Sequence, residues 1–308
     1  MICDRRALLA FAASACAAWP LPAAVDTGRT RLILLGTAGG PRPRKDRSAP
    51  AQAIISGGSI YVVDCGYGVA RQMVLAGMAL DHLTNVFITH HHSDHDIDLG
   101  PLLELAWLSG LTKAVDCWGP PPMRRMIDDY FRYEAYDIRI RQIDEHRPSF
   151  RPLVRSHEIK KGGAVMEDGR MRVTAARVVH PPIDIALAYR FDAPDRSIVI
   201  SGDTRPADSL IRLARGADVL VHEAMMPDRV LALVGKLPNG EDLARSVLSH
   251  HTSAEQAGQV AADAGVKMLV LSHLVPPEDP GVPDEEWLAA ARRHYSGPII
   301  VGRDLLEI

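Results

Sequence analysis

The sequence predicts an α/β fold in which helices cover two mixed β-sheets, and three observations lead to that prediction. Short apolar segments of strand length alternate with segments of helical spacing along the chain. The same layout appears in both halves, although the halves do not resemble each other in sequence. The 308 residues, of which 47% are hydrophobic, suffice to bury a large core. Strands and helices in this order form mixed sheets whose faces are covered by helices.

The first half opens with strands. Residues 31–35 (RLILL) have the length of a buried strand, and Gly57 and Gly58 join two further apolar runs, which is typical of a hairpin over 52–64. The elements predicted after this hairpin are helices at 69–79, 100–109 and 122–134 and strands at 85–89 and 114–119. The strand at 85–89 leads directly into the most polar stretch of the chain.

The second half again combines strands and helices. Its predicted strands are residues 170–179, 185–191, 196–201, 218–223, 267–273 and 297–302, and its predicted helices are residues 206–215 and 253–264. Three of these strands run into a residue of a metal-binding type, namely His180, Asp203 and His273. Strand ends at one sheet edge present their side chains to a shared cleft, so this regular placement favours one common site.

The polar stretch ITHHHSDHDID (88–98) holds four histidines and three aspartates in eleven positions. His90 and His92 are two residues apart just after a strand, so both imidazoles face the same side of an extended backbone. The chain must then turn, and Asp94 and His95 can point at a second metal ion beside the first. A catalytic zinc ion commonly takes three protein ligands and keeps one position for water. The three residues at the later strand ends would complete two such sites.

Five separated motifs resemble those of the metallo-β-lactamase superfamily, in the order in which the family has them. They are VVDCG with Asp64, HHHSDH, His180, SGDT with Asp203, and His273. The resemblance implies one domain over residues 25–308, built as a four-layer αβ/βα sandwich with two mixed sheets. It also implies two divalent metal ions, usually Zn²⁺, with Mn²⁺ or Fe²⁺ as alternatives because imidazole and carboxylate ligands suit several metals.

The resemblance assigns the seven candidate ligands to two metal ions that share one carboxylate. The ligands of the first ion correspond to His90, His92 and His180, those of the second to Asp94, His95 and His273, and the bridging carboxylate to Asp203. Asp64 corresponds to a position that supports the site without binding metal. An aspartate at the bridging position argues against β-lactam hydrolysis, because true β-lactamases of the superfamily lack it. It favours hydrolysis of phosphodiesters, sulfate esters or lactones.

Two further motifs, VLVHEAM and HHTSAEQAGQVAADAG, resemble the ribonuclease Z group of the superfamily. The resemblance places Glu223 next to the metal ligands. It places His251 facing the substrate, where it assists the leaving group, and leaves His250 as a bystander. Alternatively, His251 only begins the next helix, since Thr252 or Ser253 can serve as its N-cap.

The chain also departs from the ribonuclease Z pattern. Bacterial members carry a long arm that grips tRNA between the positions of His180 and Asp203, and here only PPIDIALAYRFDAPDRSIVISG lies between them. Asp96 and Asp98 occupy a turn in which the family has glycine. The segments WGPPP and LSHLVPP instead resemble exported members of the group, some of them arylsulfatase-like or phosphodiesterase-like.

Residues 1–24 have the layout of a signal peptide. Arg5 and Arg6 precede an apolar run too short to span a bilayer comfortably, and proline and small residues follow it. The arginine pair also fits a twin-arginine signal, and Cys16 offers a less favoured site for lipidation. Cleavage would leave a periplasmic or secreted protein without a transmembrane span.

These observations predict an exported binuclear-metal hydrolase that cleaves phosphodiester or sulfate ester bonds in a small molecule. Metal binding makes hydroxide available near neutral pH, Asp94 would hold the hydroxide, and His251 would protonate the leaving oxygen. The formal net charge of −3 gives no basic footprint, so nucleic acid is not expected as a partner. The alternatives are a ribonuclease Z-type tRNA 3′-processing endonuclease, a lactonase or organophosphate hydrolase, and a non-enzymatic binding protein, which the complete ligand set disfavours.

Segments 105–112 (with Trp107) and 226–248 are candidates for the walls of the substrate cleft, with ordinary packing as the alternative. If they line the cleft, an organic leaving group is favoured over a polynucleotide.

Cys65 and Cys117 are expected to be two buried thiols, although they could pair in an oxidising compartment. The sequence does not set the oligomeric state, and the resemblance allows a homodimer.

Overall fold

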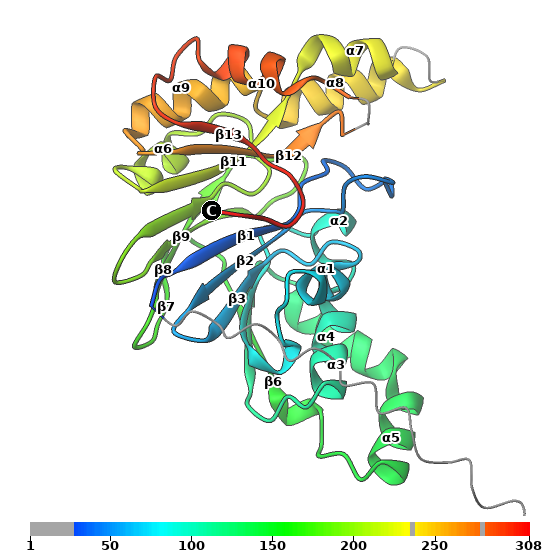
Figure 1. The fold of residues 1–308 in the computed structure, drawn as a ribbon. Coiled ribbons are helices and arrows are strands. Elements are labelled where there is room, and N and C mark those ends of the chain that lie inside the picture. Colours follow the sequence, from blue (N-terminus) through cyan, green and yellow to red (C-terminus); the bar gives the residue numbers. More distant parts are fainter. Residues whose placement is uncertain (1–27, 235–237, 278–280) are drawn as a thin grey trace, which may run out of the picture.

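The computed structural model describes residues 28–234, 238–277 and 281–308. Two seven-stranded sheets pack face to face, and helices cover their outer faces (Figure 1). This arrangement confirms the predicted αβ/βα sandwich with two mixed sheets.

The first sheet contains the strands of the N-terminal half and the last strand of the chain, in the order β14-β1-β2-β3-β4-β5-β6. The strands are β1 (Arg31–Gly36), β2 (Ala51–Ser56), β3 (Ser59–Val63), β4 (Leu83–Phe87), β5 (Val115–Gly119), β6 (Val154–Glu158) and β14 (Leu306–Glu307). Strands β3 to β6 are parallel, so their carboxyl ends lie at one edge of the sheet.

The second sheet has the order β13-β12-β11-β10-β9-β8-β7. Its strands are β7 (Gly163–Glu167), β8 (Arg172–Val178), β9 (Ala186–Asp192), β10 (Ser197–Ile200), β11 (Val219–Met225), β12 (Leu269–Val275) and β13 (Ile299–Val301). Strands β10 to β13 are parallel, and their carboxyl ends also share one edge.

Helices of the first half accompany the first sheet, and helices of the second half accompany the second (Figure 1). The first set is α1 (Val69–Leu75), η1 (Leu80–His82), α2 (Ser93–Asp96), α3 (Leu99–Leu108), α4 (Met123–Tyr133), α5 (Ala135–Asp144) and η2 (Arg151–Leu153). The second set is α6 (Asp208–Ala214), α7 (Pro227–Val234), α8 (Gly240–His250), α9 (Ala254–Ala264) and α10 (Asp284–Ala291).

Apolar side chains from both sheets fill the space between them. Phe87 of the first sheet packs edge-on against Tyr189 and Phe191 of the second, at ring-centroid distances of 5.4 and 5.1 Å. All three rings are completely buried. Burial of such rings is a large favourable term and holds the sheets in one relative position. The strand ends of the two sheets therefore face each other in a defined way.

Several elements differ from the sequence-based expectation. The helix expected over 69–79 ends at Leu75, because Gly77 adopts a φ of 75° that a helix does not allow. The segment 226–248, expected as a loop, contains the helices α7 and α8. Apolar residues of α7 and α8, among them Val230 and Ala244, form a small core of their own.

No helix in the described part of the chain is long and apolar enough to cross a membrane. The predicted signal peptide over residues 1–24, including Arg5, Arg6 and Cys16, lies outside the described residues.

Gly258 lies at a close approach of α9 to α10. A Cβ atom at this position would lie 2.2 Å from the carbonyl oxygen of Ala291. We expect Gly258→Ala to lower the free energy of unfolding, because overpacking costs about 1–3 kcal/mol and the gain in helix propensity is only about 1 kcal/mol. Chemical denaturation measures the change. Ala262→Gly, at an exposed position of the same helix, is the control for propensity alone, and a stabilised Gly258→Ala variant would contradict the packing argument.

Candidate metal centre

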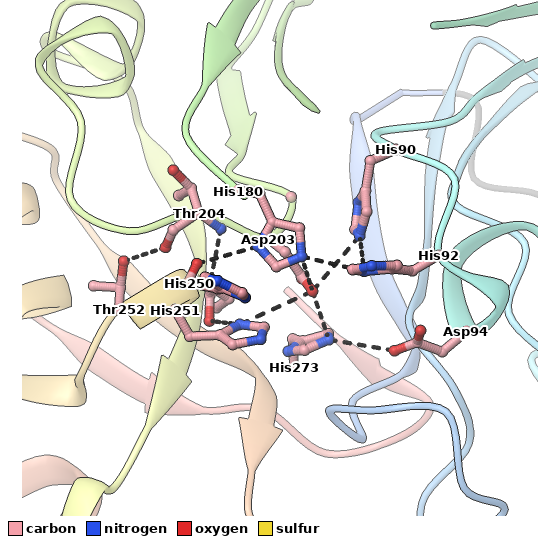
Figure 2. Close-up of polar contacts among 12 residues, drawn as sticks. His90, His92, Asp94, His180, Asp203, Thr204, His250, His251, Thr252 and His273 are labelled. Atoms are coloured by element: carbon pink, nitrogen blue, oxygen red, sulfur yellow. Dashed lines mark hydrogen bonds and ion pairs between the residues drawn. The ribbon is translucent and has the colours of Figure 1, made fainter. Parts of the chain in front are cut away.

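The first sheet supplies the polar stretch after β4. The chain leaves β4 at Phe87 and continues in extended form to His90 and His92, before α2 begins at Ser93. His90 is completely buried, and Asp94 and His95 in the first turn of α2 are nearly so. The extended and then helical backbone turns all four side chains toward the second sheet (Figure 2 shows His90, His92 and Asp94).

The second sheet supplies three residues from three different strands. His180 follows β8 and Asp203 follows β10. The expectation that a strand ends at His273 was wrong, because β12 continues to Val275. His273 lies at a bulge, where β11 pairs with Ser272 and then with Leu274, and its φ is 45°. A bulge re-aims a side chain, and this one turns His273 into the site.

The structure brings all seven predicted ligands together. They form two clusters in which the ligand atoms lie within 4.8 Å of one another, His90, His92, His180 and Asp203 in one and Asp94, His95 and His273 in the other. Asp203 lies between the clusters (Figure 2). Its Oδ2 atom is 3.8 Å from Nε2 of His180 and 3.2 Å from Nε2 of His273, and its Oδ1 atom is 3.4 Å from Nε2 of His95.

These residues fit divalent metal ions. Nε2 of His95, Nε2 of His273 and Oδ1 of Asp203 are buried without any hydrogen-bond partner. Buried polar atoms in native proteins almost always have a partner, so three such atoms directed at one another are suited to share a metal ion. Imidazole nitrogen and carboxylate oxygen are the donors that zinc and related ions take. The clusters could therefore hold metal.

Metal binding requires neutral imidazole and ionised carboxylate, and His90, His180 and Asp203 meet this requirement. His95 does not, because burial lowers its pKa but the neighbouring carboxylates, led by Asp203, hold that pKa well above its usual value. Burial, followed by the charge of His95, holds the pKa of His90 well below its usual value. Burial also lowers the pKa of His180 to about 4. Burial alone would raise the pKa of Asp203, but the charges of His273 and His95 hold it well below its usual value.

Asp64 holds two of the ligands without joining the clusters. Its Oδ2 atom accepts a hydrogen bond from Nδ1 of His95 at 2.7 Å and from the hydroxyl of Thr89 at 2.9 Å. The Thr89 hydroxyl also lies 3.1 Å from Nδ1 of His90. Such partners fix the orientation of ligand imidazoles and raise their basicity.

We expect Asp64→Ala to weaken Zn²⁺ binding by about 10- to 100-fold, as is typical when the partner of a ligand histidine is lost. Titration of the metal-free protein with Zn²⁺ against a competing chelator measures the change. Asp218→Ala serves as the matched control, because Asp218 bonds Ser197 and Lys267 away from the site. An affinity for Asp64→Ala equal to that of the control would contradict the supporting role of Asp64.

Buried Glu223 and partly buried His251 form a pair beside the clusters. Nδ1 of His251 donates to Oε2 of Glu223 at 2.9 Å, and Oε1 of Glu223 accepts from the backbone N–H of Thr204 at 2.6 Å. Burial opposes protonation of His251, but Glu223 raises its pKa to about 9. His251 Nδ1 lies 4.0 Å from Oδ2 of Asp203. Ser253 is the N-cap of α9 with a complete capping box, as the sequence allowed, and His251 is the C-cap residue of α8.

Two residues outside the expected set also shape the site. The backbone carbonyl of His250 accepts a hydrogen bond from Nδ1 of His180 at 3.1 Å. His91 stabilises the polar turn. Its Nδ1 atom lies 2.8 Å from Oδ2 of Asp96, and its Nε2 atom lies 2.8 Å from the carbonyl oxygen of Pro120. The sequence reveals neither role, because each role depends on a hydrogen bond between a histidine side chain and a backbone carbonyl group of a distant segment.

The predicted cleft walls are only partly supported. Trp107 is 1% exposed and stacks on Phe150 at 5.1 Å in the core of the first half, so its side chain does not line the site. Helix α8 of the segment 226–248 does reach the site, because it ends at His250. Cys65 and Cys117 are both buried free thiols, as expected.

Comparisons with known proteins agree with this geometry. Residues 60–274 match the model of the β-lactamase superfamily domain. The chain is 33% identical over 280 residues to a ribonuclease Z of Mycobacterium bovis, covering 90% of this chain and 97% of the relative. It is 36% identical over 279 residues to a ribonuclease Z of a Mycobacterium species (strain KMS), covering 90% and 95%.

Solved structures share the fold. Human tRNase Z, short form, superposes with a TM-score of 0.65 at 21% identity, covering 90% of this chain and 98% of that one. The metallo-β-lactamase fold protein YhfI from Bacillus subtilis superposes with a TM-score of 0.66 at 20% identity, covering 91% and 98%. The chain therefore belongs to the metallo-β-lactamase superfamily of metal-dependent hydrolases, in the branch that contains the ribonuclease Z proteins.

Proposed function

We propose that this protein is a binuclear-metal phosphodiesterase that acts on RNA, as a ribonuclease Z-type endonuclease of tRNA precursors. The convergence of seven ligand side chains beside the Glu223–His251 pair carries the proposal. Relatives named ribonuclease Z, at 33–36% identity over nearly their full length, support phosphodiester cleavage over sulfate esters or lactones. They also make nucleic acid a substrate to test, which the sequence-based expectation had disfavoured.

The chain would hold two divalent ions with the ligand sets expected from the resemblance. His90, His92 and His180 would bind one ion, Asp94, His95 and His273 the other, and Asp203 would bind both. When bound, Zn²⁺, or alternatively Mn²⁺ or Fe²⁺, acts as a Lewis acid toward a phosphoryl oxygen and makes water a stronger acid. The metal ions would be cofactors of the enzyme, and the ester whose bond is cleaved would be the substrate.

Three side chains of the protein would act on protons. Asp94 is placed at the clusters to accept a hydrogen bond from the attacking water. His251 has its Nδ1 bound to Glu223, which leaves Nε2 to donate a proton to the leaving oxygen. Glu223 is a positioning residue, because it acts through His251 and does not contact the substrate. A leaving group of high pKa, such as the ribose hydroxyl of RNA, depends most on this proton.

A second candidate function is an exported hydrolase of small phosphodiesters or sulfate esters. The interval between His180 and Asp203 favours it, because strands β9 and β10 and a short turn at 193–196 occupy that interval and leave no tRNA-binding arm. The mycobacterial relatives are of similar length to this chain, however, so the short interval does not separate it from proteins named ribonuclease Z. We keep the signal peptide over 1–24, the single domain over 25–308 and a periplasmic or secreted location as parts of this second candidate.

One substrate panel separates the candidates. The full chain, loaded with Zn²⁺, is assayed on a tRNA precursor, bis-p-nitrophenyl phosphate, p-nitrophenyl sulfate and a lactone. Accurate cleavage at the tRNA 3′ end, lost on chelation, is the expected result. Turnover of the aryl esters without tRNA cleavage, together with a cleaved leader in the producing cell, would favour the second candidate. Size-exclusion chromatography of the same preparation tests whether the chain forms the homodimer that the resemblance allows.

A further inference from the structure

Two polar side chains that the proposed chemistry does not use point into the space between the two sheets. Gln52 lies on β2 two residues before Ile54, and Ser272 lies on β12 two residues after Val270. Ile54 and Val270 belong to the apolar core between the sheets, and alternate residues of a strand point the same way. Gln52 and Ser272 therefore enter this core from opposite sheets, and only 4% and 2% of them, respectively, is exposed.

No side chain satisfies these two polar groups. Oε1 of Gln52 and Oγ of Ser272 make no hydrogen bond to any residue that the structure describes. Native proteins pair nearly all buried polar atoms with a protein group or an ordered water molecule, because an unpaired one costs free energy. The two oxygens therefore call for a small bound partner.

Gln52 and Ser272 line the same small cavity. Its volume is about 20 Å³, and every residue that lines it is buried. The metal ligands His95, Asp203 and His273 line it as well, so the cavity adjoins the metal centre. A buried water molecule needs roughly 10–15 Å³ of such volume and two to four polar partners. The cavity thus has room for one water molecule and for nothing larger.

Asp203 offers a third partner atom. Of the carboxylates that line the cavity, Asp64 and Glu223 already accept hydrogen bonds with both of their oxygens. Oδ1 of Asp203 accepts none from the described part of the chain. A carboxylate oxygen has two lone pairs, so Oδ1 can bind a metal ion and still accept a hydrogen bond.

The three partner atoms match the hydrogen-bonding capacity of water. The hydroxyl of Ser272 can donate, whereas Oε1 of Gln52 and Oδ1 of Asp203 can only accept. One water molecule accepts the first bond through a lone pair and donates its two O–H groups to the other two atoms. No proton has to move for all three bonds to form.

We propose that Gln52 and Ser272 bind one buried water molecule, which donates a hydrogen bond to Oδ1 of Asp203 and orients this carboxylate between the two metal clusters. The water would connect the shared ligand to β2 of the first sheet and to β12 of the second. Gln52 and Ser272 are positioning residues, because they act through the water and do not contact the substrate. The inference goes beyond the proposed function, since it holds whichever ester the enzyme cleaves.

A crystal structure of the Zn²⁺-loaded full chain tests the site directly. Diffraction data collected on both sides of the zinc absorption edge identify the metal ions by their anomalous scattering. We expect a peak of electron density within hydrogen-bond distance of all three partner atoms, without the anomalous signal of zinc. A cavity without density would overturn the inference. A peak with the zinc signal would also overturn it, because the cavity would then be part of the metal centre.

The affinity for Zn²⁺ measures what the water contributes. Ser272→Ala removes the donor, and Gln52→Met removes an acceptor at nearly constant side-chain length. Each variant should bind Zn²⁺ about tenfold more weakly in titrations against a chelator, the lower end of the loss when the partner of a ligand is removed. Ser56→Ala is the matched control, because Ser56 is a buried serine at the opposite end of β2 whose hydroxyl lies 3.1 Å from that of Thr30. Affinities equal to that of the control would overturn the inference.

The two substitutions should act through the same water molecule. The double variant is therefore expected to lose about tenfold in affinity, as each single variant does, instead of the roughly 100-fold loss of two independent effects. A 100-fold loss would exclude a shared water. None of these measurements uses turnover, so a wild-type protein that cleaves no tRNA precursor would refute the proposed function and leave this inference intact.

Discussion

Asp203→Ala is expected to remove metal and activity together. Asp203 is the residue that lies between both clusters, with carboxylate oxygens 3.2–3.8 Å from imidazole nitrogens of His273, His95 and His180. Without it, each ion would lose a ligand, and the negative charge between the two ions would disappear. Loss of a partner that only supports a ligand costs about 10- to 100-fold in affinity or activity, so loss of the shared ligand should cost more than about 100-fold.

Metal content and thermal stability report this effect without relying on turnover. Wild-type protein should contain two ions per chain by elemental analysis, and added Zn²⁺ should raise the Tm of its metal-free form, because a ligand stabilises the state that binds it. Asp203→Ala should show neither property. Asp218→Ala, the control used for Asp64, should lose some stability and retain its metal. A metal content in Asp203→Ala equal to that of wild type would exclude the bridging role.

His251→Ala is expected to retain both ions and to lower kcat on substrates with a poor leaving group by about 10²- to 10⁴-fold, the usual contribution of a general acid. The reason is the arrangement around the ring. Glu223 binds Nδ1 at 2.9 Å and raises the pKa of His251 to about 9, so the imidazole is protonated near neutral pH. The ring lies beside Asp203, where the leaving oxygen would emerge.

The dependence on the leaving group distinguishes a proton donor from a structural residue. With p-nitrophenolate, which leaves without a proton, the loss should be much smaller than with an RNA substrate. Glu223→Gln should change kcat in the same direction, because the ring would lose its ionised partner. His294→Ala, at an exposed histidine that pairs with Glu255, is the control. Wild-type turnover of the RNA substrate by His251→Ala would refute the assignment.

The sequence alone identified the candidate ligands, for a local reason. His90, His180 and Asp203 closely follow apolar strands, and side chains alternate along a strand, so spacing within one segment reveals direction. The pair His90 and His92 shows this most clearly. His273 lies inside β12, and Asp94 and His95 lie in α2, so this reason does not extend to them. Mixed sheets covered by helices followed from the order of strands and helices, and the four-layer αβ/βα sandwich was implied by the resemblance to the metallo-β-lactamase superfamily. Asp64 was also assigned correctly as a residue outside the clusters.

Only the tertiary structure decided how these segments meet. Asp203 and His95 belong to different sheets, and the packing of Phe87 against Tyr189 and Phe191 brings their edges together. The bulge at His273 depends on pairing between β11 and β12, which no local spacing reveals.

The same limit explains the other differences. Trp107 was a candidate for the cleft because an aromatic residue in a short segment looks the same whether it packs inside or lines a site. Its stack on Phe150, more than forty residues away, settles that it packs inside. The placing of His250 beside the site likewise depends on its hydrogen bond to His180. Residue type and spacing within one segment reveal which side chains can act as ligands. A site formed by residues from two sheets arises only when long-range packing fixes the edges of those sheets next to each other.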